Sequence, residues 1–153
     1  MSRINASTIS LLISVMLVWA ANGLCFTLLA LRMSIEGFHT TDIGLVTTGY
    51  FFGQFLGAIL FGKIIERVGH VRAFAAFASL LSASVIGYVF YVDLFIWSLI
   101  RIVHGMCIAG LLMVVESWLN GSVSNRGRGR LLTLYTIIQS TSMSMGQQLL
   151  NLE

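Results

Sequence analysis

The sequence predicts an all-α, polytopic membrane protein with about five transmembrane helices. Of its 153 residues, 57% are hydrophobic and 10% are charged, and the mean hydropathy is +0.90. A soluble domain carries about 25% charged residues, so this chain has too few charges to cover a water-soluble surface. Its apolar residues form five runs that each reach the roughly 20 residues needed to cross a bilayer. Because lipid offers no partners for backbone groups, each run has to be helical.

The expected membrane spans follow one another with short breaks. Their predicted bounds are 9–31, 43–65, 73–92, 95–119 and 131–152. The first run is too long for the apolar core of a signal peptide, so we expect it to be retained as a helix. Residues 91–93 predict a tight turn, whereas residues 120–130, rich in Gly, Ser and Arg, predict a polar loop.

The basic residues predict the orientation of the chain. With the N-terminus in the cytoplasm, seven of the nine Lys and Arg residues fall on the cytoplasmic side. These are Arg3, Lys63, Arg67, Arg72, Arg126, Arg128 and Arg130. The positive-inside rule therefore places the N-terminus in the cytoplasm, with the chain in the plasma membrane, which is the inner membrane of a bacterium. An odd number of helices is unusual for a body built from paired repeats, so we expect a fragment with downstream helices missing.

Three glycines at four-residue spacing mark one face of the second span. Gly49, Gly53 and Gly57 form a stripe without side chains, along which another helix can approach closely. We expect this stripe to be a helix-packing contact. The spacing fits both a static seam and a contact that moves during transport.

A short charged segment connects the second and third spans. Its informative residues are Gly62, Glu66, Arg67, Gly69, His70 and Arg72. The segment resembles the Gly-x-x-x-Asp-Arg-x-Gly-Arg signature of the major facilitator superfamily, with Glu66 in place of Asp and His70 in place of the second Arg. The resemblance implies a conformational role, in which this loop helps to hold two halves of a transporter together on the cytoplasmic side. A positive-inside hairpin with one compensating acid has a similar composition.

The fourth span carries a second match to the same family. Arg101, His104, Gly105 and Ala109 resemble its Arg-x-x-Gln-Gly-x-x-x-Ala pattern, with His104 replacing Gln. Three further stretches resemble the YcaD-like branch of the family, namely 115–119, 125–132 and 146–150. The resemblance covers almost the whole chain and implies that residues 1–153 form a partial amino-terminal bundle of the family's helices.

Polar residues inside the spans are the candidates for a substrate or proton pathway. An ionisable side chain in a span is costly unless it faces protein or water. Arg101 and His104 lie three residues apart and share one helix face. Asn22 and Gln139 are further candidates, and the resemblance places Asn22 and Arg101 on cavity-lining helices. Snorkelling of Arg101 and simple packing of His104 are the alternative interpretations.

Glu116 lies near the cytoplasmic end of the fourth span. It follows Arg101 by fifteen residues, which is roughly 22 Å along a helix, so the two cannot pair. We expect its partner to be Arg67, Arg72 or the basic loop 126–130. Glu116 could equally be an interface residue without a functional role.

The resemblance implies a secondary transporter that moves a small solute by alternating access, with proton coupling through Glu116 or His104. The expected partners are the lipid bilayer and an unidentified small solute, with no nucleic acid. The sequence has no HExxH or GxSxG motif and no Cys/His cluster, so we expect no enzyme activity, cofactor or metal site. Cys25 and Cys107 are expected to be packing residues. A five-helix membrane scaffold or assembly subunit without transport activity is the alternative function.

Overall fold

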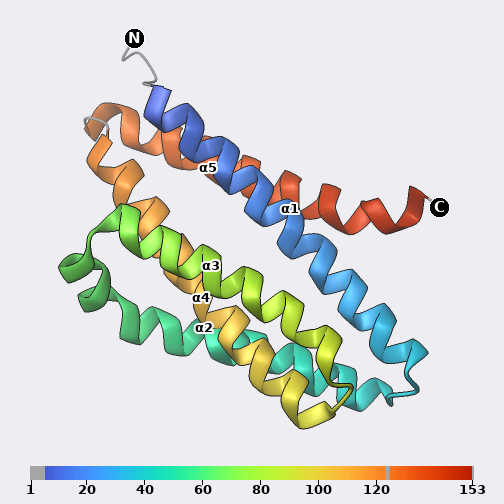
Figure 1. Cartoon of the computed structure of the whole chain (residues 1–153). Helices are drawn as coiled ribbons and strands as arrows, with labels where there is room; N and C mark the ends of the chain where they lie inside the picture. The colour runs from blue at the N-terminus through green and yellow to red at the C-terminus, as the bar shows by residue number, and fades with distance from the viewer. Residues whose placement is uncertain (1–5, 123–124, 153) are drawn as a thin grey trace. The chain divides into compact units, whose positions relative to one another are not determined.

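The computed structural model describes residues 6–122 and 125–152, and within these residues the chain is all-α, as the sequence predicts (Figure 1). The helices are α1 (Ala6–Ile35), α2 (Thr40–Val68), α3 (His70–Phe90), α4 (Leu94–Ser122), α5 (Asn125–Gln148) and the short 3-10 helix η1 (Leu149–Leu152). Arg3, one of the residues that predict the orientation, lies outside the described residues, as does Ser124.

Four of the helices are long and apolar enough to cross a membrane. Their candidate spans are Ile9–Ile35, Thr40–Val68, His70–Phe90 and Leu94–Gly121. The α5 helix, with 24 residues, does not meet the same criterion, because Arg, Gln, Ser and Gly residues dilute its apolar residues. A membrane span in α5 therefore stays a prediction. The four apolar helices make this a multi-pass membrane protein in contact with the lipid bilayer.

The helices extend beyond the apolar runs that predict them. The clearest difference concerns residues 120–130, expected to be a polar loop. There α4 continues to Ser122 and α5 already begins at Asn125. Hydropathy indicates which residues can lie in lipid. A helix, in contrast, continues wherever its backbone hydrogen bonds can form and no proline interrupts them. The polar residues of this region therefore extend the helices rather than ending them.

A single residue, Gly69, separates α2 from α3. Its φ of 89° and ψ of 153° lie in a region that only glycine adopts without strain. Its N–H donates to the Ile65 carbonyl at 2.9 Å, and its own carbonyl accepts from the Ala73 N–H at 3.0 Å. Gly69 thus closes one helix and opens the next with no intervening loop.

Two aspartates fix the starts of α2 and α4. The Asp42 carboxylate accepts the His39 N–H at 3.1 Å, and the Asp93 carboxylate accepts the Ile96 N–H at 2.9 Å. Both acids lie at helix N-termini, where backbone donors lack partners and the helix dipole favours negative charge.

The chain divides into two compact units. The first unit contains Met1–Arg32 and Val115–Glu153, and the second contains Met33–Val114. The first unit is thus built on α1 and α5, and the second on α2, α3 and most of α4.

In the first unit, α1 and α5 cross with their backbones in contact (Figure 1). A Cβ added at Gly23 would overlap the Met143 carbonyl oxygen, and one added at Gly146 would overlap the Ala20 carbonyl oxygen. Only glycine fits at either position, because any side chain would push the two helices apart. We call this contact the α1/α5 crossing.

In the second unit, α2 and α4 cross in the same way. A Cβ at Gly53 would overlap the Ile102 carbonyl oxygen, and one at Gly105 would overlap the Tyr50 carbonyl oxygen. We call this contact the α2/α4 crossing. The α3 helix packs on both partners. A Cβ at Gly110 of α4 would lie 2.6 Å from the Phe77 ring of α3. The same ring makes a tilted contact with Phe61 of α2, at 4.6 Å between centroids.

Candidate functional site

The candidate site lies within the second unit and is centred on one face of α4. Trp97, Arg101 and His104 follow one another at helical spacing, and all three side chains are buried, with Arg101 and His104 each 1% exposed. Arg101 and His104 are the two predicted site residues that the structure brings together. A buried guanidinium inside a candidate span is costly and needs polar or aromatic surroundings.

Tyr50 of α2 supplies part of these surroundings. The guanidinium carbon of Arg101 lies 5.4 Å from the centroid of the Tyr50 ring, within the range of a cation–π interaction. The His104 ring lies 5.9 Å from the same ring, between centroids. The Gln54 side-chain amide donates to the Tyr50 hydroxyl at 3.0 Å. Tyr50 therefore contacts both Arg101 and His104, and the α2/α4 crossing next to it holds it in place.

Ser84 of α3 contacts the other side of the imidazole. Its hydroxyl oxygen lies 3.4 Å from His104 Nδ1 and 2.7 Å from the Leu81 carbonyl oxygen. When the single hydroxyl hydrogen is directed to Leu81, the serine oxygen accepts a hydrogen bond from a protonated Nδ1. In that arrangement Ser84 favours the tautomer of a neutral His104 that carries its hydrogen on Nδ1.

An aromatic group covers the end of the site nearest the start of α4. Trp97 makes an edge-on contact with Tyr88 at 6.0 Å and a tilted contact with Phe38 at 5.6 Å, both between ring centroids. Its indole N–H donates to the Tyr91 carbonyl. Trp97 has no exposed surface and lies one helical turn before Arg101, so its indole ring closes this end of the site.

The other predicted pathway residues belong to the first unit. Asn22 is 2% exposed and directly precedes Gly23, so it lies beside the α1/α5 crossing. Gln139 is half-buried on α5, whereas Ser142, one turn further on, is buried. The structure therefore describes Asn22 and Gln139 in a different unit from Arg101 and His104.

Glu116, also in the first unit, is exposed on the last turns of α4. Its carboxylate interacts electrostatically with Tyr135 of α5. Tyr135 is 3% exposed, and its hydroxyl has no hydrogen-bond partner among the described residues. The pairing of Glu116 with Arg67 or Arg72 joins residues of different units and stays a prediction.

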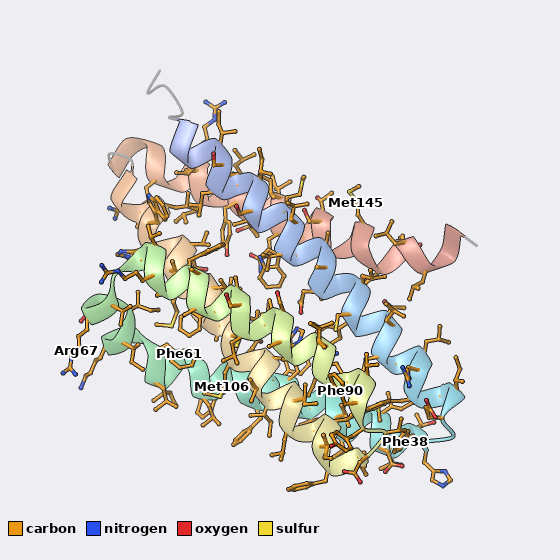
Figure 2. The ribbon with its side chains drawn as sticks, in the orientation of Figure 1. Phe38, Phe61, Arg67, Phe90, Met106 and Met145 are labelled. Carbon is orange, nitrogen blue, oxygen red and sulfur yellow. The ribbon has the colours of Figure 1, made fainter. Side chains whose placement is uncertain are left out.

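The charged segment between the second and third spans is built around Gly69. Glu66 and Arg67 are exposed in the last turn of α2, and Figure 2 shows Arg67 projecting from this end of the helix. His70 and Arg72 lie in the first turn of α3, half-buried and exposed respectively. Gly62 lies two helical turns before Gly69 and faces the Met113 side chain of α4.

The predicted glycine stripe faces α4 throughout. At Gly49 an added Cβ would make only ordinary contacts, 3.4 Å from the Ser98 carbonyl oxygen. At Gly53 it would overlap Ile102, and at Gly57 it would lie 2.9 Å from Ala109. The three positions therefore tolerate side chains to different degrees, with Gly53 at the point of closest approach.

Sequence reasoning missed the structural equivalence of the two crossings. The segments 17–25 and 99–107 share a Leu-x5-Gly-x-Cys pattern, which aligns Gly23 with Gly105. The segments 53–56 and 146–149 share Gly-Gln-x-Leu, which aligns Gly53 with Gly146. By these patterns and by the matching glycine contacts, α1 corresponds to α4 and α2 corresponds to α5. These short patterns were the available signal for Gly23 and Gly146.

Tyr50 and Ser84 are functional candidates that carried no sequence signal. Both residue types are common in apolar spans, and only the packing of three helices brings them to His104. Among the described residues, no group of three or more His, Cys, Asp or Glu side chains is placed to hold a metal ion.

The fold and the buried ionisable pair define a polytopic helical membrane protein with a polar site inside its apolar segments. The sequence profile of the Major Facilitator Superfamily matches residues 11–149. The chain belongs to this family.

Two relatives are similar over almost the whole chain. An uncharacterized MFS-type transporter of Enterobacter sp. (strain 638) is 31% identical over 151 residues, which are 99% of this chain and 40% of that protein. The uncharacterized MFS-type transporter YcaD of Escherichia coli is 30% identical over the same shares. The chain thus spans about two fifths of the length of these relatives. No solved structure matches the chain.

Proposed function

We propose that the chain is the amino-terminal part of a secondary transporter that moves a small solute across the plasma membrane by alternating access. The observation that carries this proposal is the buried Arg101–His104 pair within a candidate span of a chain belonging to the Major Facilitator Superfamily. Ionisable residues in such a position are expensive and mark solute or proton pathways in membrane proteins. Both relatives are named as transporters, which supports the same conclusion.

In the proposed mechanism, Arg101 and His104 contact the solute or the coupling proton. Asn22 and Gln139 are further candidates for the pathway, and Glu116 is a second candidate for the proton. The segment from Gly62 to Arg72 acts in the conformational change. Arg67 and Arg72 are exposed at a helix junction, where they can pair with an acid in one state and release it in another.

The deciding experiment measures solute uptake and efflux by the gene product that contains this chain, beside its expression level in membranes. We expect Arg101→Ala to abolish transport, and Glu116→Gln to reduce transport more than expression. Arg32→Ala, which removes an exposed arginine at the end of α1, is the matched control and should transport normally. Wild-type transport by both the Arg101 and Glu116 variants would contradict the proposed roles.

The proposed orientation places the N-terminus in the cytoplasm. Cysteine at Glu36, an exposed residue next to Phe38, should react with an impermeant reagent only from outside the cell. Cysteine at Ser124 should react only from the cytoplasm. The parent chain, whose two cysteines lie in apolar segments, gives the background labelling. The reverse pattern would overturn the orientation.

A further inference from the structure

The net positive charge of the chain comes from the first unit alone. That unit, residues 1–32 and 115–153, contains five arginines but only two acidic residues, Glu116 and Glu153. The second unit, residues 33–114, contains four basic and four acidic residues. A surface with an excess of one charge attracts partners of the opposite charge, so an anionic partner is expected on the first unit.

Three of the five arginines lie in the segment 126–130, at the start of α5. The side chains of Arg128 and Arg130 are both exposed, and we call these two residues the junction arginines. Nη2 of Arg128 donates to the Asn120 carbonyl at 3.3 Å, which ties the start of α5 to the last turns of α4. Residues 117–152 contain no Asp or Glu, so Glu116 is the nearest acid in the sequence. A single carboxylate offsets at most one of these positive charges.

Two glycines leave open space beside the junction arginines. Gly129 lies between them in the sequence, and Gly121 follows Asn120 at the end of α4. A Cβ added at either glycine would meet no described atom within 4 Å. A bulky anionic group can therefore approach the backbone and the guanidinium groups here without displacing a side chain.

The junction arginines lie where the apolar segments end. The candidate span of α4 ends at Gly121, and the apolar run of α5 begins directly after Arg130. Lipid headgroups occupy the depth at which apolar spans give way to polar residues. The phosphate of a phospholipid is thus present at this depth, and the planar guanidinium fork matches its oxygens.

We propose that the junction arginines form a binding site for the headgroup phosphate of an anionic phospholipid. A zwitterionic lipid carries its own cation beside the phosphate, whereas the charge of an anionic lipid is available to the arginines. The predicted orientation places the site at the cytoplasmic leaflet, which is the leaflet that carries a negative surface potential. The site does not depend on the transport of a solute.

The test measures the relative affinity of phosphatidylglycerol and phosphatidylcholine for the full 153-residue chain in mixed bilayers. Brominated acyl chains, placed on one lipid at a time, quench tryptophan fluorescence at close range. Trp118 is half-buried and lies two residues before Asn120, whereas Trp19 and Trp97 are buried, so quenching reports mainly on lipid near the junction. We expect phosphatidylglycerol to bind at least about tenfold more tightly, because each arginine near an anionic lipid contributes about fivefold in affinity. Equal affinities for the two lipids would overturn the proposal.

Matched variants test whether the junction arginines are the source of this preference. Arg128→Gln and Arg130→Gln should each lower it about fivefold. The Arg130 variant is the cleaner of the two, because it leaves the hydrogen bond between Arg128 and Asn120 in place. Arg32→Gln removes the same charge from an exposed position at the end of α1 and should leave the preference unchanged. An equal loss in all three variants would show that net charge attracts the lipid, and a preference that persists in both junction variants would place the lipid elsewhere; either result contradicts the site.

Two further measurements on the wild-type chain identify the ligand. Sodium chloride should weaken the preference, since attraction between exposed charges is screened, and a preference independent of salt would argue against an ionic contact. Soluble glycerol phosphate offers the same phosphate without acyl chains. We expect it to leave quenching by brominated phosphatidylglycerol unchanged, because the acyl chains hold the lipid phosphate at the site. Displacement of the lipid by glycerol phosphate would assign the site to a free phosphate compound and refute the lipid proposal.

Discussion

The α1/α5 crossing of the first unit and the α2/α4 crossing of the second unit share a backbone arrangement but differ in their side chains. In each crossing, a glycine of either helix lies against a backbone carbonyl oxygen of the other helix. The residue that supplies this carbonyl lies three positions before the glycine of its own helix. Yet Asn22 stands at the position of His104, and Trp19 stands at the position of Arg101. Met143 likewise replaces Tyr50.

This difference separates two requirements on the same helices. Close contact between backbones needs glycine at particular positions, so both crossings keep it. The neighbouring side chains contribute little to that contact and can differ in chemistry. The second unit uses this freedom to bury a cation and an imidazole, whereas the first unit buries an amide and an indole. The buried ionisable side chains Arg101 and His104 therefore lie at only one of the two similar crossings.

The largest expected effect comes from breaking the α2/α4 crossing. Gly53→Leu should lower the free energy of unfolding by about 3 kcal/mol or more, because the new side chain must separate α2 from the Ile102 carbonyl. Unfolding in mild detergent measures the change. Ala58→Leu, at an exposed position of α2, is the control and should be close to wild type. Equal losses would show that Gly53 does not face α4.

The α1/α5 crossing should respond to a smaller substitution in the same direction. Gly146→Ala places a methyl group against the Ala20 carbonyl and should cost about 1–3 kcal/mol. In contrast, Gly129→Ala on the same helix has no atom within 4 Å of the new methyl group. It should raise stability by about 0.5–1 kcal/mol through helix propensity. If both variants gain stability, the two crossings are not equivalent.

Exchanging side-chain chemistry between the crossings should cost less. His104→Asn gives the second unit the residue of the first. It should lower the free energy of unfolding by about 1 kcal/mol, through lost contacts with Tyr50 and Ser84. Thermal unfolding in detergent measures this change. Complete unfolding of the variant would mean that the α2/α4 crossing depends on its polar side chains.

The smallest expected effect is a gain in stability within the first unit. Tyr135→Phe removes a buried hydroxyl that has no hydrogen-bond partner among the described residues. The variant should be as stable as wild type or more stable by about 1 kcal/mol. Tyr91→Phe removes an exposed hydroxyl and should leave stability unchanged. A loss specific to Tyr135→Phe would show that its hydroxyl has a partner, with Glu116 as the nearest charged candidate.

Much of the fold followed from the apolar runs of the sequence. These runs predicted the all-α class because membrane burial leaves the backbone no alternative to helices. They did not predict that residues 120–122 and 125–130 are helical, because helix formation does not stop where the apolar segment ends. Hydropathy also could not decide whether α5 crosses the membrane, because its composition lies between that of a span and that of a surface helix.

The candidate site was only partly predictable for a related reason. Arg101 and His104 stood out because ionisable residues in apolar segments are rare. Tyr50 and Ser84 did not, since their contact with His104 depends on which helices are neighbours. A spacing of four residues revealed the stripe containing Gly53, whereas neither Gly23 nor Gly146 has another glycine four residues away in its helix. Their importance arises from the crossing of two helices and not from a pattern within one.

Gly69 gives the junction of α2 and α3 an unusual mechanical property. The residue is hydrogen-bonded to both helices, so its own φ and ψ set the angle between them. Because no loop lies between the helices, a change in their angle is made mainly by rotation about these two torsions. The hydrogen bonds of Gly69 to both helices restrict that rotation. The exposed charges of Glu66 and Arg67 are thus joined by continuous backbone, without a flexible loop, to the helix that carries Ser84.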